Sequence, residues 1–216
     1  MEIVPFGDSA LLVRLEGPIT PHGWRRLQRL REAIDGASVP GVGGPVPGAS
    51  TLLVPFDPLV ADPSEVEKVV LALEGRLEDA TDHGAPAIIE LPTRYGGQAG
   101  PDLAAVARRA DLSEAAVVRL HASVEYEVAF LGFAPGFAYC GSVPTAIATP
   151  RLHRPRERVP AGSVGIADTW TAVYPGSTAG GWNLIGRTNT SVWDPRRRPP
   201  ALLAPGLRVR FVPGDA

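Results

Sequence analysis

Glycines and prolines divide the second half of this chain into short segments, and this restricts the folds it can adopt more than any other feature. The chain holds 24 glycines and 23 prolines in 216 residues. From Glu125 onward the prolines stand at the ends of β-prone runs and in turns, where a missing backbone N–H is tolerated. Many short strands bounded by turns predict a β-barrel or a β-sandwich. The β-prone runs are residues 126–130, 162–167, 171–174, 184–185 and 207–212.

The first part of the chain follows a different pattern, which predicts strand, strand, helix, strand, helix. Residues 2–6 and 10–15 flank a Gly-Asp-Ser turn of the kind that closes a hairpin, and residues 51–55 are also β-prone. Thr20-Pro21 and Asp62-Pro63-Ser64-Glu65 suit the capped first turns of two helices. Two amphipathic helices over a small sheet make a two-layer α/β domain. The predicted buried faces are Trp24, Leu27, Leu30 and Ile34, then Val66, Val69, Val70, Leu73 and Leu77.

The pattern changes around residues 81–86, where we place the domain boundary. A strand is expected at residues 87–91, followed by short helices at 102–110 and 113–121. The prediction is an α+β protein with an N-terminal domain at residues 1–83 and a β-rich domain at residues 84–216.

Composition excludes several classes of protein. The net charge of −2 gives no basic balance for nucleic acid binding. The only lysine, Lys68, lies in a predicted solvated helix face, and no Gly-Lys-Ser/Thr run exists, so the chain has no phosphate-binding P-loop. No apolar run approaches a membrane span, and the N-terminus lacks a signal-peptide pattern. With the single cysteine Cys140, a reducing compartment fits, so we expect a cytoplasmic protein.

Several familiar site motifs can be rejected. His22, His83, His121 and His153 form no pair with zinc-ligand spacing, so no metal site is expected. The run Ala161-Gly162-Ser163-Val164-Gly165 is similar to a nucleophile elbow, but it lacks the first glycine and the strand-to-helix transition. The glycines of residues 41–44 lack dinucleotide-binding spacing, and Pro45 would interrupt a following helix.

Three segments carry the residue types of a binding site. Residues 131–139 alternate aromatic rings with glycine and proline, which fits either a loop that presents rings to a pocket or a closely packed barrel core. Residues 154–163 hold arginines between prolines. Arginines braced in this way suit carboxylate or phosphate ligands, although a solvated rim would have the same composition. Residues 180–188 again place an arginine beside glycines and an aromatic ring, and exposed glycine amides can bind an oxyanion.

These segments resemble the family of 5-oxoprolinase B subunits, also known as allophanate hydrolase subunit 1 or as histidine-kinase-inhibitor-like. The matching phrases occur in family order, and weaker similarity extends through the N-terminal part. They are Arg94-Tyr95-Gly96-Gly97, Gly100-Pro101-Asp102-Leu103, Leu131-Gly132-Phe133, Pro135-Gly136-Phe137, Pro150-Arg151, Pro155-Arg156, Val159-Pro160-Ala161-Gly162-Ser163-Val164, Gly180-Gly181-Trp182 and Gly186-Arg187-Thr188.

The resemblance implies an N-terminal two-layer α/β domain followed by a cyclophilin-like β-barrel. It also implies the B-type subunit of an ATP-dependent 5-oxoprolinase, which opens 5-oxoproline to glutamate together with a C-type and an A-type subunit and is inactive alone. ATP would be a co-substrate of the complex. Two alternatives remain open at this point: a carboxyltransferase subunit of the allophanate hydrolase or urea carboxylase type, and a binding module that inhibits a histidine kinase.

Residue roles follow from this resemblance together with chemistry. Arg156 and Arg187 are expected to clamp an anion, and His121 is the candidate general acid or base. A helix-end histidine bonded to a backbone carbonyl is an equal alternative for His121, and Asp102 is interpreted as a helix cap. The expected substrate-binding residues are Phe133, Pro135, Gly136, Tyr174, Gly162, Ser163, Gly180, Gly181 and Trp182.

Overall fold

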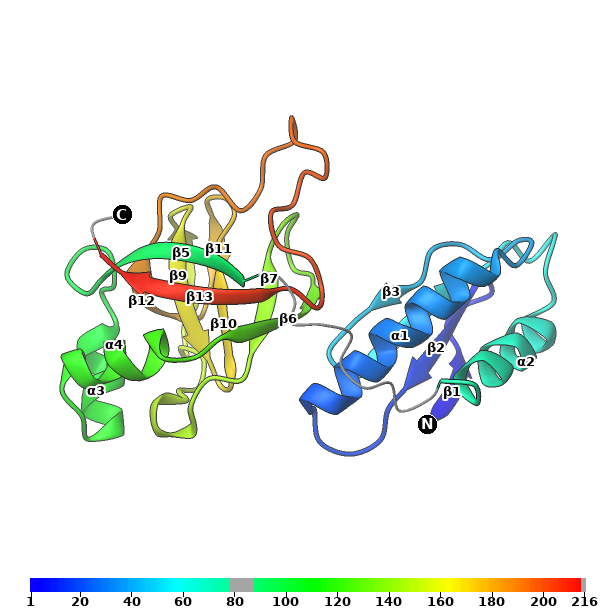
Figure 1. Cartoon of the computed structure of the whole chain (residues 1–216), viewed down its shortest axis with the longest axis horizontal. Helices are drawn as coiled ribbons and strands as arrows, with labels where there is room; N and C mark the ends of the chain where they lie inside the picture. Colours follow the sequence, from blue (N-terminus) through cyan, green and yellow to red (C-terminus); the bar gives the residue numbers. More distant parts are fainter. Residues whose placement is uncertain (78–87, 215–216) are drawn as a thin grey trace. The chain divides into compact units, whose positions relative to one another are not determined.

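The computed structural model describes residues 1–77 and 88–214, which belong to two compact units, Met1–Ala85 and Pro86–Ala216. Figure 1 shows the architecture of each unit, helices on a sheet in the first and a barrel in the second. The expected boundary between residues 83 and 84 lies outside the described residues, as do His83 and the first residue of the strand expected at 87–91.

The N-terminal unit is built on a four-stranded antiparallel sheet with the strand order β1-β2-β4-β3. The predicted hairpin is confirmed, with Pro5 paired to Leu11 and Gly7 in a left-handed conformation at φ 70°. The sequence did not predict β3, a two-residue strand in the Gly/Pro-rich connection that pairs with β4. The strands are β1 (Glu2–Pro5), β2 (Ala10–Arg14), β3 (Val46–Pro47) and β4 (Thr51–Pro55).

Two capped helices pack on this sheet, α1 (Pro21–Ala37) and α2 (Pro63–Glu74). The Thr20 side chain accepts a hydrogen bond from the Gly23 amide, and Asp62 accepts one from Ser64, so both predicted starts are confirmed. The helices and the sheet share one core, as the predicted two-layer arrangement requires. Its buried members are Leu11, Val13, Leu27, Leu30, Ile34, Leu52, Val54, Phe56, Ala61, Val66 and Val70.

The C-terminal unit is a closed barrel in which the strands follow the order β10-β7-β6-β13-β5-β12-β9. Of the two β architectures that the sequence allowed, the structure has the barrel. The β5–β13 pair is parallel, whereas the other barrel pairs are antiparallel. The barrel strands are β5 (Ile88–Tyr95), β6 (Tyr126–Leu131), β7 (Ala138–Gly141), β9 (Ser163–Ala167), β10 (Trp170–Val173), β12 (Asn183–Arg187) and β13 (Arg208–Pro213).

Three strands lie where the sequence suggested loops. β7 follows the aromatic segment, and a separate two-stranded sheet pairs β8 (Arg156–Val159) with β11 (Thr178–Gly180). Arg156 therefore lies at the start of a strand and not in a proline-braced loop. These strands escaped prediction because each is three or four residues long and shows no clear alternation of apolar and polar residues.

The predicted short helices are confirmed as α3 (Leu103–Ala110) and α4 (Glu114–Ala122), and they are accompanied by a 3-10 turn, η1 (Thr145–Ile147). α3 contacts β12, and α4 contacts β13. The two helices lie beside each other at one end of the barrel (Figure 1). This packing holds the connection between β5 and α3 against the barrel wall.

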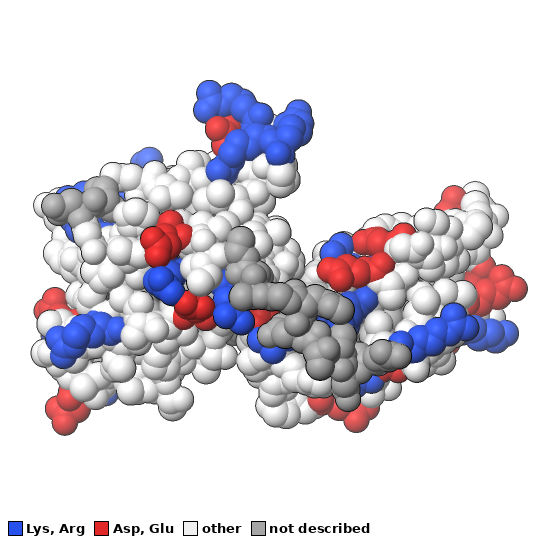
Figure 2. All heavy atoms as spheres, in the orientation of Figure 1, with Lys and Arg blue, Asp and Glu red and all other residues white. Residues whose placement is uncertain are grey.

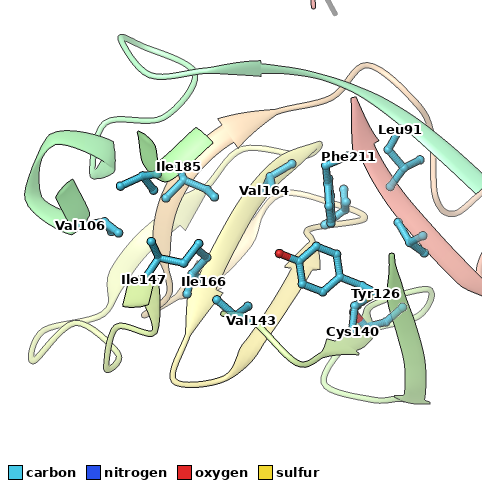
Figure 3. Packing of buried hydrophobic residues seen from close by; sticks show 14 of the residues in the cluster. Leu91, Val106, Tyr126, Cys140, Val143, Ile147, Val164, Ile166, Ile185 and Phe211 are labelled. Carbon is cyan, nitrogen blue, oxygen red and sulfur yellow. The ribbon is translucent and has the colours of Figure 1, made fainter. Parts of the chain in front are cut away.

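Alternation along the strands separates two apolar clusters. Figure 3 shows the interior cluster, in which Val164 and Ile166 of β9 point toward Tyr126 and Phe211. Ala167, the next residue of β9, belongs to a second cluster with Phe137, Tyr174 and Trp182. Since adjacent strand residues face opposite sides, the second cluster lies on the outer wall. Val159 of β8 is also a member, so the small β8–β11 sheet covers this part of the wall.

The run Arg196-Arg197-Arg198 lies in a largely exposed turn between β12 and β13. Figure 2 shows basic side chains gathered on this projection. Arg196 bonds Asp194, and Arg197 donates to the backbone carbonyls of Ser191 and Pro200. These contacts give the arginines a local structural role.

Candidate functional site

His121 lies in the barrel interior, in the last turn of α4, and is fully buried. Its Nδ1 lies 2.8 Å from the Tyr95 hydroxyl, and its Nε2 lies 2.9 Å from Thr171 Oγ1. Thr171 donates its hydroxyl proton to the Gly165 carbonyl, so it must accept from Nε2–H. Nδ1 is then the acceptor for the Tyr95 hydroxyl, which assigns the Nε2–H tautomer from the hydrogen-bond network.

These surroundings hold His121 neutral. Burial against Tyr126 and Phe211 lowers the pKa of His121 to about 3. The alternative interpretation of His121 expected a hydrogen bond to a backbone carbonyl, but the ring bonds two side chains instead. Both nitrogens already have partners inside the barrel, which weighs against a role as general acid or base. That role stays a prediction.

The expected aromatic residues meet on the outer wall of the barrel. The Phe137 ring lies 5.2 Å from Tyr174 and 5.3 Å from Trp182, both in edge-to-face geometry. Tyr139 lies 5.6 Å from Trp182. Phe133 differs from the rest: it is 61% exposed and adopts a left-handed φ of 68°. Both interpretations of residues 131–139 therefore hold in part, because one ring is presented and the others are packed.

Tyr174 brings a hydroxyl into this apolar cluster. Burial raises the pKa of Tyr174, while the Trp182 backbone amide and the arginines Arg151 and Arg156 act in the opposite direction. Gly180 makes room for the phenol, since a Cβ there would stand 2.4 Å from Tyr174 Oη. Gly180 is thus required for packing at this position. Pro135 is exposed nearby, whereas Gly136 is buried against Trp193.

Arg156 of β8 forms an ion pair with Asp102, the residue that precedes α3. Its Nη2 lies 2.6 Å from one carboxylate oxygen, and the other oxygen accepts from the Leu184 amide at 2.7 Å. Asp102 stands at the N-cap position of α3 but makes no side-chain capping bond, so its interpretation as a cap was wrong. Arg156 Nη1 is buried and has no hydrogen-bond partner within the described residues. Any anion at Arg156 would have to compete with Asp102.

Two of the glycine-rich-segment residues expected to bind substrate donate their backbone amides to carbonyls of the chain itself. Gly162 donates to the Tyr174 carbonyl at 2.8 Å, and Ser163 donates to the Pro160 carbonyl at 3.3 Å. A Cβ on Gly162 would lie 2.2 Å from the Thr188 carbonyl oxygen, so the glycine permits a close backbone approach. Gly181 packs beside the Arg151 guanidinium. The assignment of these residues to substrate binding stays a prediction.

Arg187 lies in a different place from Arg156. It lines a hollow of about 380 Å³ together with Arg94, Tyr95, Gly96, Gly97, Gln98 and Ala99, and Arg156 is not part of that lining. Its Nε donates to the Ala161 carbonyl at 3.1 Å. The sequence pointed to residues 94–97 only through the family resemblance and assigned them no role.

The described residues contain no group of three His, Cys, Asp or Glu side chains that could hold a metal ion. Within the same residues, no helix has the length and hydropathy needed to cross a membrane.

Comparison with known proteins reveals the family. Residues 1–203 match the family described as carboxyltransferase domain, subdomain C and D. The 5-oxoprolinase B subunit of Escherichia coli O157:H7 is 44% identical over 209 residues, which are 96% of this chain and 93% of that protein. The chain belongs to the family of 5-oxoprolinase B subunits. The members from Bacillus subtilis (strain 168) and Haemophilus influenzae are 39% and 34% identical, and the match covers 98% of this chain in each case.

Solved structures extend the comparison for this family member. The crystal structure of TTHA0988 superposes with a TM-score of 0.83 at 36% identity, covering 96% of this chain but 40% of that one. PH0987 from Pyrococcus horikoshii is 40% identical with a TM-score of 0.58, covering 99% and 98% of the two chains. The urea carboxylase of Kluyveromyces lactis has a TM-score of 0.77 at 21% identity, covering 99% of this chain and 22% of that one, and this likeness concerns the fold alone.

Proposed function

We propose that this chain is the B subunit of an ATP-dependent 5-oxoprolinase, a hydrolase that opens the lactam of 5-oxoproline to glutamate. The observation that carries the proposal is the nearly full-length match to three 5-oxoprolinase B subunits at 34–44% identity. The urea carboxylase likeness does not support a rival proposal because it concerns the fold alone. The same proposal includes a cytoplasmic location.

The chemistry explains why arginines matter in such an enzyme. A lactam carbonyl is a poor electrophile, and phosphorylation of its oxygen by ATP would activate it for attack by water. Phosphoryl transfer depends mainly on positioning and on electrostatic stabilisation of the developing charge. This chain supplies Arg156, which is paired with Asp102, and Arg187 at the hollow as candidates. The lack of a P-loop leaves room for ATP to bind elsewhere in the complex.

We further propose that the chain acts with a C-type partner and an A-type partner. Relatives are named as subunits, which fits an assembly of several chains. This chain also matches 40% of TTHA0988, so a solved relative carries its counterpart joined to a longer stretch of polypeptide. A separate partner chain could supply what that longer protein holds in one chain.

Reconstitution tests the proposal. The chain would be co-expressed with C-type and A-type 5-oxoprolinase subunits, and ATP hydrolysis would be measured with and without 5-oxoproline. We expect ADP and glutamate to form in equal amounts, and only when all partners are present. A complete, folded complex that hydrolyses ATP at the same rate without 5-oxoproline would refute the assignment.

A further inference from the structure

The segment Arg94-Tyr95-Gly96-Gly97 takes no part in the outer-wall cluster, yet it forms most of the hollow that contains Arg187. In the β5–β12 ladder, Arg94 lies directly opposite Arg187, one position beyond the Tyr95–Gly186 pair. Opposed residues of an antiparallel pair project to the same face. Both side chains are exposed, and both line the hollow.

The turn after β5 presents three successive backbone amides to the hollow. Gly96 and Gly97 follow one another in left-handed conformations, at φ 70° and 52°. The amides of Gly97, Gln98 and Ala99 donate to no acceptor among the described residues, and all three residues line the hollow. Successive backbone N–H groups in such a turn form concavities that hold anions. A Cβ on Gly97 would meet nothing within 4 Å, so the space beside it is open.

Hydrogen bonds to the rest of the barrel unit hold Arg187 and the turn after β5 in place. Arg187 Nε is bonded to the Ala161 carbonyl, and no described acceptor bonds its terminal nitrogens. Tyr95 turns its hydroxyl inward to His121, which anchors the first residue of the turn to the barrel interior. Gly100 at the other end donates to the Gly96 carbonyl and lies against β12, where a Cβ would be 2.0 Å from the Ile185 carbonyl oxygen.

The described lining of the hollow is basic. Among the described residues that line it are two arginines and no carboxylate. Glu114 is the acidic side chain beside the turn, and it lies on the Gly96 side, where its Oε2 would be 3.6 Å from an added Cβ. The volume of about 380 Å³ falls within the range of roughly 300–1,000 Å³ that is usual for small-molecule sites.

We propose that this hollow is an oxyanion-binding site, in which Arg94, Arg187 and the amides of residues 97–99 hold a carboxylate or a phosphoryl group. The proposal deepens the 5-oxoprolinase assignment and rests on it for the two sources of the anion, the carboxylate of 5-oxoproline and the phosphoryl group delivered by ATP. It replaces the expected pairing of Arg187 with Arg156 by a pairing with Arg94.

Direct binding to the purified full-length chain tests the proposal without any turnover. Inorganic phosphate, 5-oxoproline and pyrrolidin-2-one, which lacks the carboxylate, would be titrated separately while amide resonances are followed by NMR. We expect saturable shifts at Gly97, Gln98 and Ala99 with phosphate, with 5-oxoproline or with both, and none with pyrrolidin-2-one. Shifts with phosphate alone would assign the phosphoryl source, and shifts with 5-oxoproline alone would assign the carboxylate source.

Variants separate the site from general charge effects. Arg187→Gln and Arg94→Gln should each weaken binding at least tenfold, whereas Arg196→Gln, on a side chain that is 88% exposed in the projecting turn, should not. Thermal melts would verify folding, and Gly97→Ala offers a second variant that strains the turn without removing charge. Absence of saturable shifts with both anions, or unchanged binding in both arginine variants, would overturn the proposal. The 5-oxoprolinase assignment would fail separately, in the reconstituted turnover assay.

Discussion

The surroundings of single side chains in this barrel, and not their residue type alone, determine their chemistry. His121 is a residue that normally titrates near neutral pH, yet its position among Tyr126 and Phe211 makes the charged form unfavourable. Arg156 is a residue suited to a ligand carboxylate, yet it already bonds the carboxylate of Asp102. At this scale, the structure shows hydrogen-bond partners for both candidate catalysts, and their catalytic roles stay predictions.

The barrel should lose stability in mild acid because of His121. Its pKa is about 3 when folded and about 6.5 when unfolded. Between these values the unfolded state binds more protons, so this contribution is fully present above pH 6.5 and falls by up to about 1.4 kcal/mol per pH unit as pH decreases. His121→Gln should remove this slope, whereas His153→Gln, at an exposed position, should keep it. Urea unfolding at pH 7.5 and at pH 5 measures the change in the free energy of unfolding. Hydrogen exchange of the β6 and β13 amides at the same two pH values tests whether the change concerns the barrel. Equal slopes in the wild type and His121→Gln would contradict it.

The Asp102–Arg156 pair should stabilise the chain through its connection to β12. The pair is partly buried, with side-chain exposures of 12% and 30%, and Asp102 also holds the Leu184 amide. Arg156→Gln leaves a carboxylate with a single partner, so we expect a loss of about 1–3 kcal/mol. A double-mutant cycle with Asp102→Asn, measured by thermal unfolding, should show non-additive losses. Additive losses would mean that the two residues act independently.

Glycines, which have no Cβ, let backbone segments of this barrel approach one another closely. The clearest example is the connection between β5 and α3. The backbone of Gly100 lies so close to β12 that a Cβ would be 2.0 Å from the Ile185 carbonyl oxygen. Two residues later, Asp102 accepts a hydrogen bond from the Leu184 amide, which joins the β5–α3 connection to β12. The wall of the hollow therefore depends on backbone contact between these two elements.

Gly100→Ala should destabilise the barrel by several kcal/mol, because the backbone of β12 cannot move without breaking its ladder. Gly176→Ala is the matched control, since a Cβ there meets nothing within 4 Å and the residue has no left-handed φ. Thermal unfolding of both variants gives the comparison. Similar melting temperatures for the two would show that the close approach relaxes at little cost.

The loop between β6 and β7 should contribute to partner binding through Phe133. This ring is 61% exposed beside the packed outer-wall cluster, and its left-handed φ is unusual for a bulky residue. In a complex with the C-type subunit, Phe133→Ser should weaken association about tenfold or more while leaving the melting temperature of the isolated chain nearly unchanged. Analytical ultracentrifugation of mixtures would measure this. Leu59→Ser, at a 94% exposed position of the N-terminal unit, serves as the control. Equal affinities of the two variants would argue against a contact at Phe133.

The whole molecule consists of two units with separate cores, and its proposed activity requires further chains. The N-terminal core joins α1 and α2 to the small sheet, whereas the barrel has its own interior cluster and its own outer-wall cluster. The family match extends over residues 1–203 and thus includes both units. Any function assigned to the family therefore belongs to the whole chain and not to the barrel alone.

The isolated chain should show negligible ATPase activity. It has no P-loop, and its single lysine, Lys68, lies on an exposed position of α2 in the N-terminal unit. A coupled ADP assay on highly purified chain should give background rates with or without 5-oxoproline. Robust turnover that follows this chain through two purification steps would contradict its role as a dependent subunit.

The sequence alone determined the elements whose signals are local. Capped helix starts at Thr20 and Asp62, the hairpin around Gly7 and the short β-prone runs depend on neighbouring residues, and the structure confirms them. The family was also accessible from ordered motifs, as the comparisons confirm.

Tertiary structure alone decided which side chains meet. Tyr95 bonds His121 from 26 residues away, Asp102 bonds Arg156 from 54 and Leu184 from 82. The position of Arg94 opposite Arg187 depends on the register of β12, which shifts at an irregularity between Leu184 and Gly186. A shift of one residue turns a side chain to the other face of a strand, and no local pattern reports that shift. The sequence therefore proposed Arg187 as a site residue, whereas barrel closure placed it in one hollow with Arg94 and the turn at residues 96–99.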